Sequence, residues 1–258
     1  MTAFLASIGA AFLTFLAAAG RLALFTGRAL AAGATPPYYP RMIARQIVFV
    51  GYYSLPVVGL TALFTGMVLA LQSYTGFARF NAEGAVATVV VLSVTRELGP
   101  VIAALMVAGR VGAAMAAEIG TMRVTEQIDA LTTLSTDPLR YLVLPRLLAG
   151  ALTLPALVLV ADIIGVFGGF LVGTYKLSFN PVAYLTQTEQ YLATTDVVSG
   201  LVKAAVFGFL VALMGCYQGY HSRGGAEGVG QATTYAVVSA SILILLSDYF
   251  LTQAFFAR

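Results

Sequence analysis

The chain has 258 residues, of which 59% are hydrophobic and only 10% are charged. A soluble domain usually carries about 25% charged residues, so the composition predicts a polytopic membrane protein and argues against an ordinary soluble domain. The 14 Lys and Arg residues barely outnumber the 11 Asp and Glu residues, so the basic residues indicate membrane topology rather than a nucleic-acid surface. A single cysteine, Cys216, and a single histidine, His221, exclude an internal disulfide, multi-Cys or His-cluster metal sites and most Ser-His catalysis. We therefore expect no catalytic residues and no metal ligands in this chain.

The first predicted element is a helix within residues 1–33. Residues 3–20 are uncharged, but no Lys or Arg precedes them, so the basic start of a signal peptide is missing. A narrow polar stripe instead recurs every seven residues and consists of Ser7, Thr14, Arg21 and Arg28. This pattern is typical of a helix that lies in the membrane interface, with a sixth membrane-spanning helix as the alternative.

Five later segments are apolar enough to cross the hydrocarbon core, which takes about 20 residues. The predicted spans are residues 47–74, 85–115, 141–175, 197–217 and 232–256. With the N-terminus in the cytoplasm, most Arg and Lys residues outside the spans are cytoplasmic, as the positive-inside rule requires, and the C-terminus is periplasmic. The loop at residues 177–196 is then a periplasmic cap, and the glycine-rich loop at residues 219–230 is cytoplasmic.

Two local patterns belong to the third predicted span. Asp137 followed by Pro138 predicts a helix N-cap with proline at the first helical position. Gly165, Gly169 and Gly173 recur every four residues and predict a groove for close helix packing. Flexible lining of a pore is the alternative use of these glycines.

Residues 117–137 form a charged segment between two long apolar segments, and we interpret it as a cytoplasmic coupling segment. At helical spacing Val124, Ile128 and Leu131 share one face, while Glu126 and Asp129 share another. The pattern predicts a short amphipathic helix that rests on the membrane bundle and offers its acidic residues to a soluble partner. An ordinary solvated helix in a loop is the alternative.

We single out five ionisable residues inside the predicted spans, where each costs about 2.5–3.5 kcal/mol at the membrane centre and is a functional candidate. They are Arg96, Glu97, Asp162, Lys203 and Asp248, and all five fall in the outer half of the bilayer, which predicts a polar pocket that opens outward. One arrangement pairs Glu97 with Lys203 and leaves Arg96 available for an anion such as a lipid phosphate. The alternative is a closed set of salt bridges that only locks the helices. Asp162 and Asp248 are expected to form hydrogen bonds within the bundle.

Two further observations concern the substrate and the energy source. Phe77 and Phe80, where the first span reaches the outer surface, could contact acyl chains, although packing or interfacial anchoring is the commoner role of such aromatic residues. No GxxxxGK[ST] motif occurs, so the chain cannot hydrolyse ATP through a P-loop, and ATP would be bound by a partner subunit.

The charged segment and its neighbours carry a family resemblance. The run from Arg110 through AAEIGTMRVTEQIDAL to Leu139 closely resembles the MlaE-type permease subunit of MCE lipid transporters, an ABC class. The resemblance continues in Thr95–Pro100 of the second span, in Gly219-Tyr220, and in Asp248 of the last span. It covers nearly the whole chain and is weakest in the first 40 residues and in the outer loop.

The resemblance implies an all-α permease with an interfacial N-terminal helix, five spans, a short cytoplasmic coupling helix and a homodimeric assembly. It implies a cytoplasmic MlaF-type ATPase, a hexameric MlaD-type MCE protein on the other side, and in some systems a small MlaB-type STAS protein. The helix at residues 118–131 would dock on the ATPase, and Arg96, Glu97 and Lys203 match the positions that contact a lipid headgroup. The candidate coupling residues are Glu118, Arg123, Glu126, Asp129 and Leu131, and the candidate substrate residues are Arg96, Glu97, Lys203, Phe77 and Phe80. The loop at residues 221–225 departs from the family pattern, and no role is assigned to it.

Together these features predict a multi-pass permease of the bacterial inner membrane that moves phospholipid to or from a periplasmic path and so maintains outer-membrane lipid asymmetry. The chain itself is expected to be no enzyme and to hold no cofactor. A permease for a sterol-like or hopanoid-like lipid is one alternative, and an ion-coupled secondary transporter is another, although the spans show no inverted repeat.

Overall fold

The computed structural model describes residues 2–34, 36–80 and 82–256, and every regular element in these ranges is helical. The α-helices are α1 (Thr2–Ala31), α2 (Pro40–Val50), α3 (Leu55–Phe77), α4 (Val86–Ser93), α5 (Gly99–Val107), α6 (Ala113–Val124), α7 (Gln127–Thr133), α8 (Leu144–Tyr175), α9 (Pro181–Tyr191), α10 (Thr194–Tyr220) and α11 (Gly225–Phe256). Three short 3₁₀ segments are η1 (Tyr52–Ser54), η2 (Ala78–Phe80) and η3 (Glu83–Ala85), and three π-helical segments are η4 (Val94–Leu98), η5 (Ala108–Gly112) and η6 (Leu139–Val143). The predicted all-α membrane fold is confirmed.

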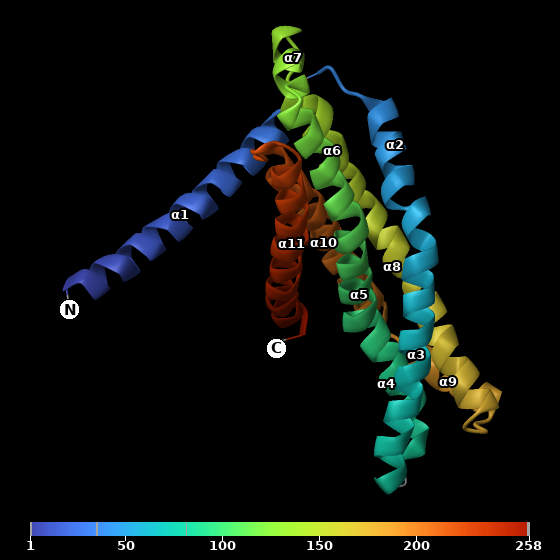
Figure 1. Cartoon of the computed structure of the whole chain (residues 1–258). Helices are drawn as coiled ribbons and strands as arrows, with labels where there is room; N and C mark the ends of the chain where they lie inside the picture. Colours follow the sequence, from blue (N-terminus) through green and yellow to red (C-terminus); the bar gives the residue numbers. More distant parts are fainter. Residues whose placement is uncertain (1, 35, 81, 257–258) are drawn as a thin grey trace.

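Several of these elements join end to end into long helices that cross the bundle. Within the described residues, six helical segments are long and apolar enough to span a membrane: Phe12–Ala31, Pro40–Phe80, Glu83–Val124, Leu139–Tyr175, Thr194–Tyr220 and Gly225–Phe256. The last five correspond to the five predicted spans but extend beyond most of the predicted ends. The bundle has two distinguishable ends, one carrying α7 and the other carrying α9 and the turn between α3 and α4 (Figure 1). We call them the α7 end and the α9 end.

The first helix, α1, leaves the bundle at an angle and contacts it only near its own C-terminal end (Figure 1). Phe25 and Ala29 are buried there, and the Phe25 ring meets the Tyr217 ring edge-on at 5.4 Å between centroids. Arg21 and Arg28 of the predicted polar stripe are exposed. Because α1 is also long and apolar enough to span, its placement in the membrane interface stays a prediction.

The glycine stripe of α8 is a helix-packing surface, as the spacing predicted. A Cβ atom on Gly66 of α3 would overlap the carbonyl oxygen of Gly165, and one on Gly168 would overlap the carbonyl oxygen of Leu63. Such close backbone approach is possible only without side chains at the crossing. Helix α3 therefore lies directly against α8 at Gly165 and Gly168, whereas Gly169 and Gly173 of the stripe face Val90 of α4 and Tyr184 of α9.

Two predicted loops are shorter than expected because helices extend into them. The glycine-rich loop predicted at residues 219–230 reduces to a turn between α10 and α11, in which Gly224 and Gly225 have φ angles of +87° and +72°. Glycine adopts this conformation with little strain. Of the other glycines in the segment, Gly219 lies in α10, and Gly228 and Gly230 lie in α11.

At the α9 end, the predicted cap is the helix α9. The Asn180 side chain caps it by accepting a hydrogen bond from the Val182 amide at 2.9 Å. Asp196, which we predicted to end the loop at residues 177–196, is instead buried in the first turn of α10. At the α7 end, the Asp137 carboxylate accepts from the Leu139 amide at 3.0 Å, so it does cap the start of the third span.

The α3–α8 crossing yields a stability prediction. Gly66→Ala should lower the thermal midpoint of the detergent-solubilised protein by several degrees, because relieving the overlap with Gly165 costs about 1–3 kcal/mol. Gly76→Ala, on the same helix, is the matched control, since a Cβ atom on Gly76 would meet no other atom within 4 Å. Equal midpoints for the two variants would contradict the close crossing.

Candidate functional site

Lys203 is the centre of an ionic cluster that joins η4, α10 and α11. Its side chain is completely buried, and its Nζ lies 2.8 Å from Glu97 Oε2 and 2.9 Å from Asp248 Oδ1. Nζ also donates to Thr252 Oγ1 at 2.7 Å and to the Arg96 carbonyl oxygen at 3.0 Å. The Thr252 hydroxyl lies in turn 3.1 Å from Glu97 Oε1. The predicted pairing of Glu97 with Lys203 and the predicted contact of Asp248 within the bundle are present.

The proline that follows η4 explains why a backbone carbonyl is available to Lys203. Pro100 has no N–H group, so it cannot make the usual helical hydrogen bond to the carbonyl of Arg96, four residues earlier. The chain widens into the π-helical segment η4 just before this proline. The freed Arg96 carbonyl oxygen then accepts from Lys203.

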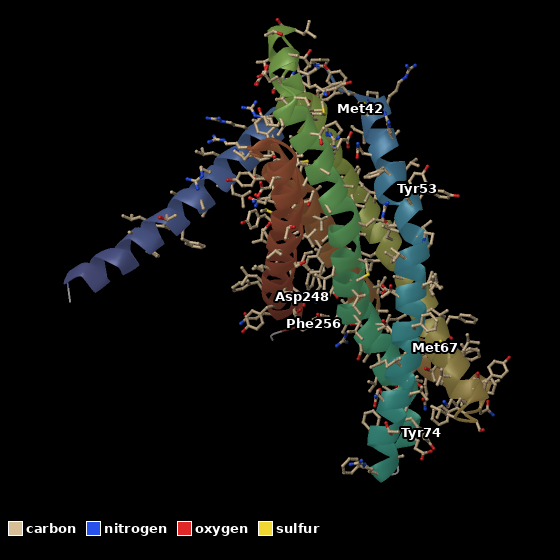
Figure 2. All side chains as sticks on the ribbon, in the orientation of Figure 1. Met42, Tyr53, Met67, Tyr74, Asp248 and Phe256 are labelled. Carbon is tan, nitrogen blue, oxygen red and sulfur yellow. The ribbon has the colours of Figure 1, made fainter. Side chains whose placement is uncertain are left out.

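Arg96 forms an ion pair, in contrast to the arrangement that left it available for an anion. Its Nε and Nη2 both lie 2.8 Å from Asp196 Oδ1, and the Asp196 side chain is only 1% exposed. The Arg96 guanidinium also lies over the Phe256 ring at 4.6 Å. Phe256 and Asp248 both belong to the last turns of α11 (Figure 2). We missed Asp196 because the loop boundary was placed after it rather than before it.

The cluster is open on one side. The Arg96 and Glu97 side chains are 36% and 38% exposed, whereas the Lys203 side chain is completely buried. An arginine and a carboxylate next to a buried lysine can therefore still meet an external group.

Three predicted residues lie outside the cluster. Asp162 does not join it: its Oδ1 atom faces Gly99 and has no hydrogen-bond partner among the described residues, so the predicted hydrogen bond is absent. Phe77 ends α3 and packs partly against the small apolar group around Val90. Phe80 in η2 is 79% exposed at the α9 end.

Arg110 is a further intramembrane cation, which the sequence analysis did not single out. It belongs to η5, and its Nη2 donates to the Phe49 carbonyl oxygen at 2.6 Å and to Ser54 Oγ at 2.7 Å. Both acceptors lie at the break between α2 and α3. The signal was available, because Arg110 follows ten apolar or small residues within a predicted span.

The charged segment at the α7 end is two helices rather than one. Helix α6 ends at Val124, the chain turns at Thr125 and Glu126, and α7 begins at Gln127. Glu126 has a φ angle of +59°, a left-handed conformation that no α-helix contains, so the continuous helix predicted over residues 118–131 is wrong. Arg123 Nη1 and Asp129 Oδ1 form an ion pair at 2.7 Å across this turn.

Glu118 lies on α6 rather than on the short helix, and it holds a buried partner. Its Oε2 is 2.8 Å from Arg146 Nη2, and the Arg146 side chain is only 2% exposed. Arg146 also donates to the Leu142 carbonyl oxygen at 2.6 Å. Glu118 thus joins the end of α6 to the start of α8.

The short helix α7 is attached to the bundle through its apolar face, as predicted. Ile128 is 1% exposed, and Leu131 is partly buried against the main core. Asp129, Glu126 and Leu134 remain exposed, Leu134 to 74%. The exposed face of α7 and its flanking turns is therefore open to another molecule.

Comparison with known proteins decides the family. A family model described as permease MlaE matches residues 43–254. The intermembrane phospholipid transport system permease protein MlaE of Haemophilus influenzae is 35% identical over 255 residues, which cover 98% of this chain and 97% of that protein. The chain belongs to the MlaE permease family.

Two further proteins are similar along most of the chain. A probable ABC transporter permease protein of Rickettsia felis is 61% identical over 250 residues, covering 97% of this chain and 96% of that protein. A probable ABC transporter permease protein of Synechocystis is 43% identical over 216 residues, covering 84% of this chain and 82% of that protein. The chain is thus a permease subunit of the ABC class and a multi-pass membrane protein, and the predicted resemblance is confirmed.

The ionic cluster of this MlaE-family permease yields a second stability prediction. Lys203→Met should destabilise the fold by about 3 kcal/mol, because it leaves Glu97 and Asp248 without their shared cation. Adding Glu97→Gln and Asp248→Asn should recover most of this loss, since neutral side chains need no cation. Thermal midpoints in detergent measure both effects.

Lys176→Met is the control, because it makes the same substitution at an exposed lysine at the end of α8. A triple variant as unstable as Lys203→Met would show that the loss comes from packing rather than from unpaired charge.

Proposed function

We propose that this permease moves phospholipid between the inner membrane and a periplasmic path, and so supports outer-membrane lipid asymmetry. The observation that carries the proposal is the ionic cluster, in which buried Lys203 holds Glu97 in place while Arg96 and Glu97 stay partly exposed. The name of the Haemophilus influenzae relative, a phospholipid transport permease, supports the same substrate class.

The exposed pair suits a zwitterionic headgroup. Arg96 is fixed by Asp196 and keeps N–H groups for a phosphate, and Glu97 is fixed by Lys203 and Thr252 and keeps carboxylate surface for an ammonium group. Because these anchors hold both side chains, little conformational entropy is lost when the headgroup binds. The acyl chains would lie on the apolar helix surfaces around the cluster.

The assembly that fits this role is a homodimer whose two protomers enclose the lipid. An MlaF-type ATPase would bind at the α7 end, and an MlaD-type hexameric MCE protein would sit at the α9 end, with an MlaB-type STAS protein as a further cytoplasmic subunit. This arrangement places the α7 end and the N-terminus in the cytoplasm and the C-terminus in the periplasm, in the orientation that the positive-inside rule favours.

The coupling step would run from α7 into the spans. The exposed face of α7 offers Glu126 and Asp129 to the ATPase, while Ile128 and Leu131 fix the helix to the bundle core. The Arg123–Asp129 ion pair closes the turn between α6 and α7, so a push on α7 reaches α6. From α6 it reaches α8 through Glu118 and Arg146. Closure of the protomers would then expel the lipid or admit it.

Transport measurements test the headgroup contact. Arg96→Ala and Glu97→Gln in the assembled complex should each slow phospholipid transfer between vesicles by about tenfold, the loss expected for one charge-assisted hydrogen bond. ATP hydrolysis should continue, because neither residue lies at the α7 end. Glu189→Gln is the control, since Glu189 is exposed on α9 and forms no ion pair with the described cluster residues.

Unchanged transfer by both cluster variants would remove the headgroup role and leave the cluster as a lock between helices. Mass spectrometry of lipid that co-purifies with the complex identifies the substrate class, and a sterol-like or hopanoid-like lipid in place of phospholipid would overturn the phospholipid assignment.

A second measurement tests the coupling step. Arg123→Gln should lower the lipid transferred per ATP hydrolysed by about fivefold, because it opens the ion pair that braces the turn before α7. Arg45→Gln removes an exposed arginine of α2 and should leave this ratio unchanged. Equal ratios for the two variants would contradict a coupling role for the α6–α7 turn.

A further inference from the structure

An apolar crevice lies along α8 and shares no lining residue with the ionic cluster. Its volume is about 420 Å³, and its walls come from α4, η4, α8, α9 and the start of α10. Along α8 it extends from Leu159 to Phe170. Thr95 of η4 forms part of its back wall, whereas the next two residues of η4 belong to the ionic cluster. The crevice and the cluster are therefore two separate places divided by η4.

The length of the crevice matches one leaflet of a bilayer. The eleven residue steps from Leu159 to Phe170 span about 16 Å at 1.5 Å per residue, which is about half of the 30 Å hydrocarbon thickness. They occupy the half of α8 that is nearer to α9. A transmembrane helix of a partner would need a groove along the whole span, but a single acyl chain crosses one leaflet only.

The mouth of the crevice faces the surroundings of the bundle with apolar side chains. Ile163 and Phe167 on α8 are 64% and 52% exposed, and Leu185 on α9 is 54% exposed. The inner wall is buried, with Val91 only 1% exposed. In a membrane-spanning bundle such a mouth opens to hydrocarbon, and a chain from the bilayer can enter it sideways.

One buried polar group at the α9 end lacks a partner. The Tyr184 side chain lines the crevice and is 3% exposed, and its hydroxyl has no hydrogen-bond partner among the described residues. Burial raises the pKa of Tyr184 to about 12, so the hydroxyl stays protonated and can donate a hydrogen bond. A buried hydroxyl without a partner costs about 1–3 kcal/mol, so a ligand that accepts from it is favoured. Asp162 also lines the crevice, but its unpartnered Oδ1 atom is turned toward Gly99, which is not part of the crevice wall.

We propose that the α8 crevice binds one acyl chain of a bilayer phospholipid, with the Tyr184 hydroxyl donating to an ester carbonyl oxygen at the glycerol end of that chain. This lipid is distinct from the transported lipid at the ionic cluster. The apolar walls suit an acyl chain, and the length of the crevice matches one leaflet. The Tyr184 hydroxyl belongs to α9, at the end of the bundle where a glycerol ester would lie.

Photocrosslinking tests the proposal on the full chain in lipid nanodiscs and on the assembled complex. The probe is phosphatidylethanolamine with a diazirine on one acyl chain, and mass spectrometry maps the labelled peptides. Label should concentrate on residues 159–170 of α8 and on α9. Val166→Phe fills the crevice and should reduce this label by about tenfold, since an overfilled site has no room for the chain. Tyr184→Phe removes only the hydroxyl and should reduce it by about fivefold.

Two matched controls accompany these variants. Val238→Phe places the same ring at an exposed position on α11, and Tyr191→Phe removes an exposed hydroxyl from the same α9, so both should keep full labelling. Label spread evenly over all the outer helix surfaces, or label unaffected by both crevice variants, would overturn the proposal.

Loss of the label in the complex, with crosslinks from α8 to a partner's transmembrane helix, would also overturn it. Because Val166 and Tyr184 lie outside the ionic cluster, these results are independent of the headgroup measurements on Arg96 and Glu97.

Discussion

The buried ammonium of Lys203 is the constraint on which the rest of this bundle depends. An unpaired lysine inside a membrane is costly, so the helices around it must supply acceptors. Glu97 and Asp248 supply negative charge, and the Thr252 hydroxyl oxygen is a third acceptor. The Arg96 carbonyl oxygen is a fourth acceptor, because Pro100 has no N–H group to donate to it. Helix α10 can come this close because Gly200, one turn before the lysine, lies directly against the Thr95 carbonyl.

Two further embedded cations follow the same principle. Arg110 donates to the Phe49 carbonyl oxygen at the break between α2 and α3, and Arg146 donates to the Leu142 carbonyl oxygen within η6. In each case the cation lies where the regular helical hydrogen bonds are interrupted. The irregular segments of this bundle are therefore acceptor sites for charge, which explains why the π-helical segments occur beside charged residues rather than at random.

Local signals in the sequence were sufficient for the spans, the glycine stripe and the cap at Asp137, because each depends on residues close together in the chain. The Glu97–Lys203 pair was predictable as well, since few charges lie at the same depth in the spans. The partner of Arg96 was not, because Asp196 joins the bundle only if α10 begins before it. The break at Glu126 was likewise hidden, because Arg123 and Asp129 form their ion pair only across that turn, at a separation that no helical pattern predicts.

The segment η4 links the two ends and the two sites of this permease. It belongs to one long helical segment, Glu83–Val124, which ends at the turn braced by Arg123. One side of η4 holds Arg96 and Glu97 in the ionic cluster, and its other side holds Thr95 in the wall of the α8 crevice. A shift of this helix along its axis therefore moves both walls together. A lipid chain held in the crevice would resist that shift, so the occupancy of one site bears directly on the geometry of the other.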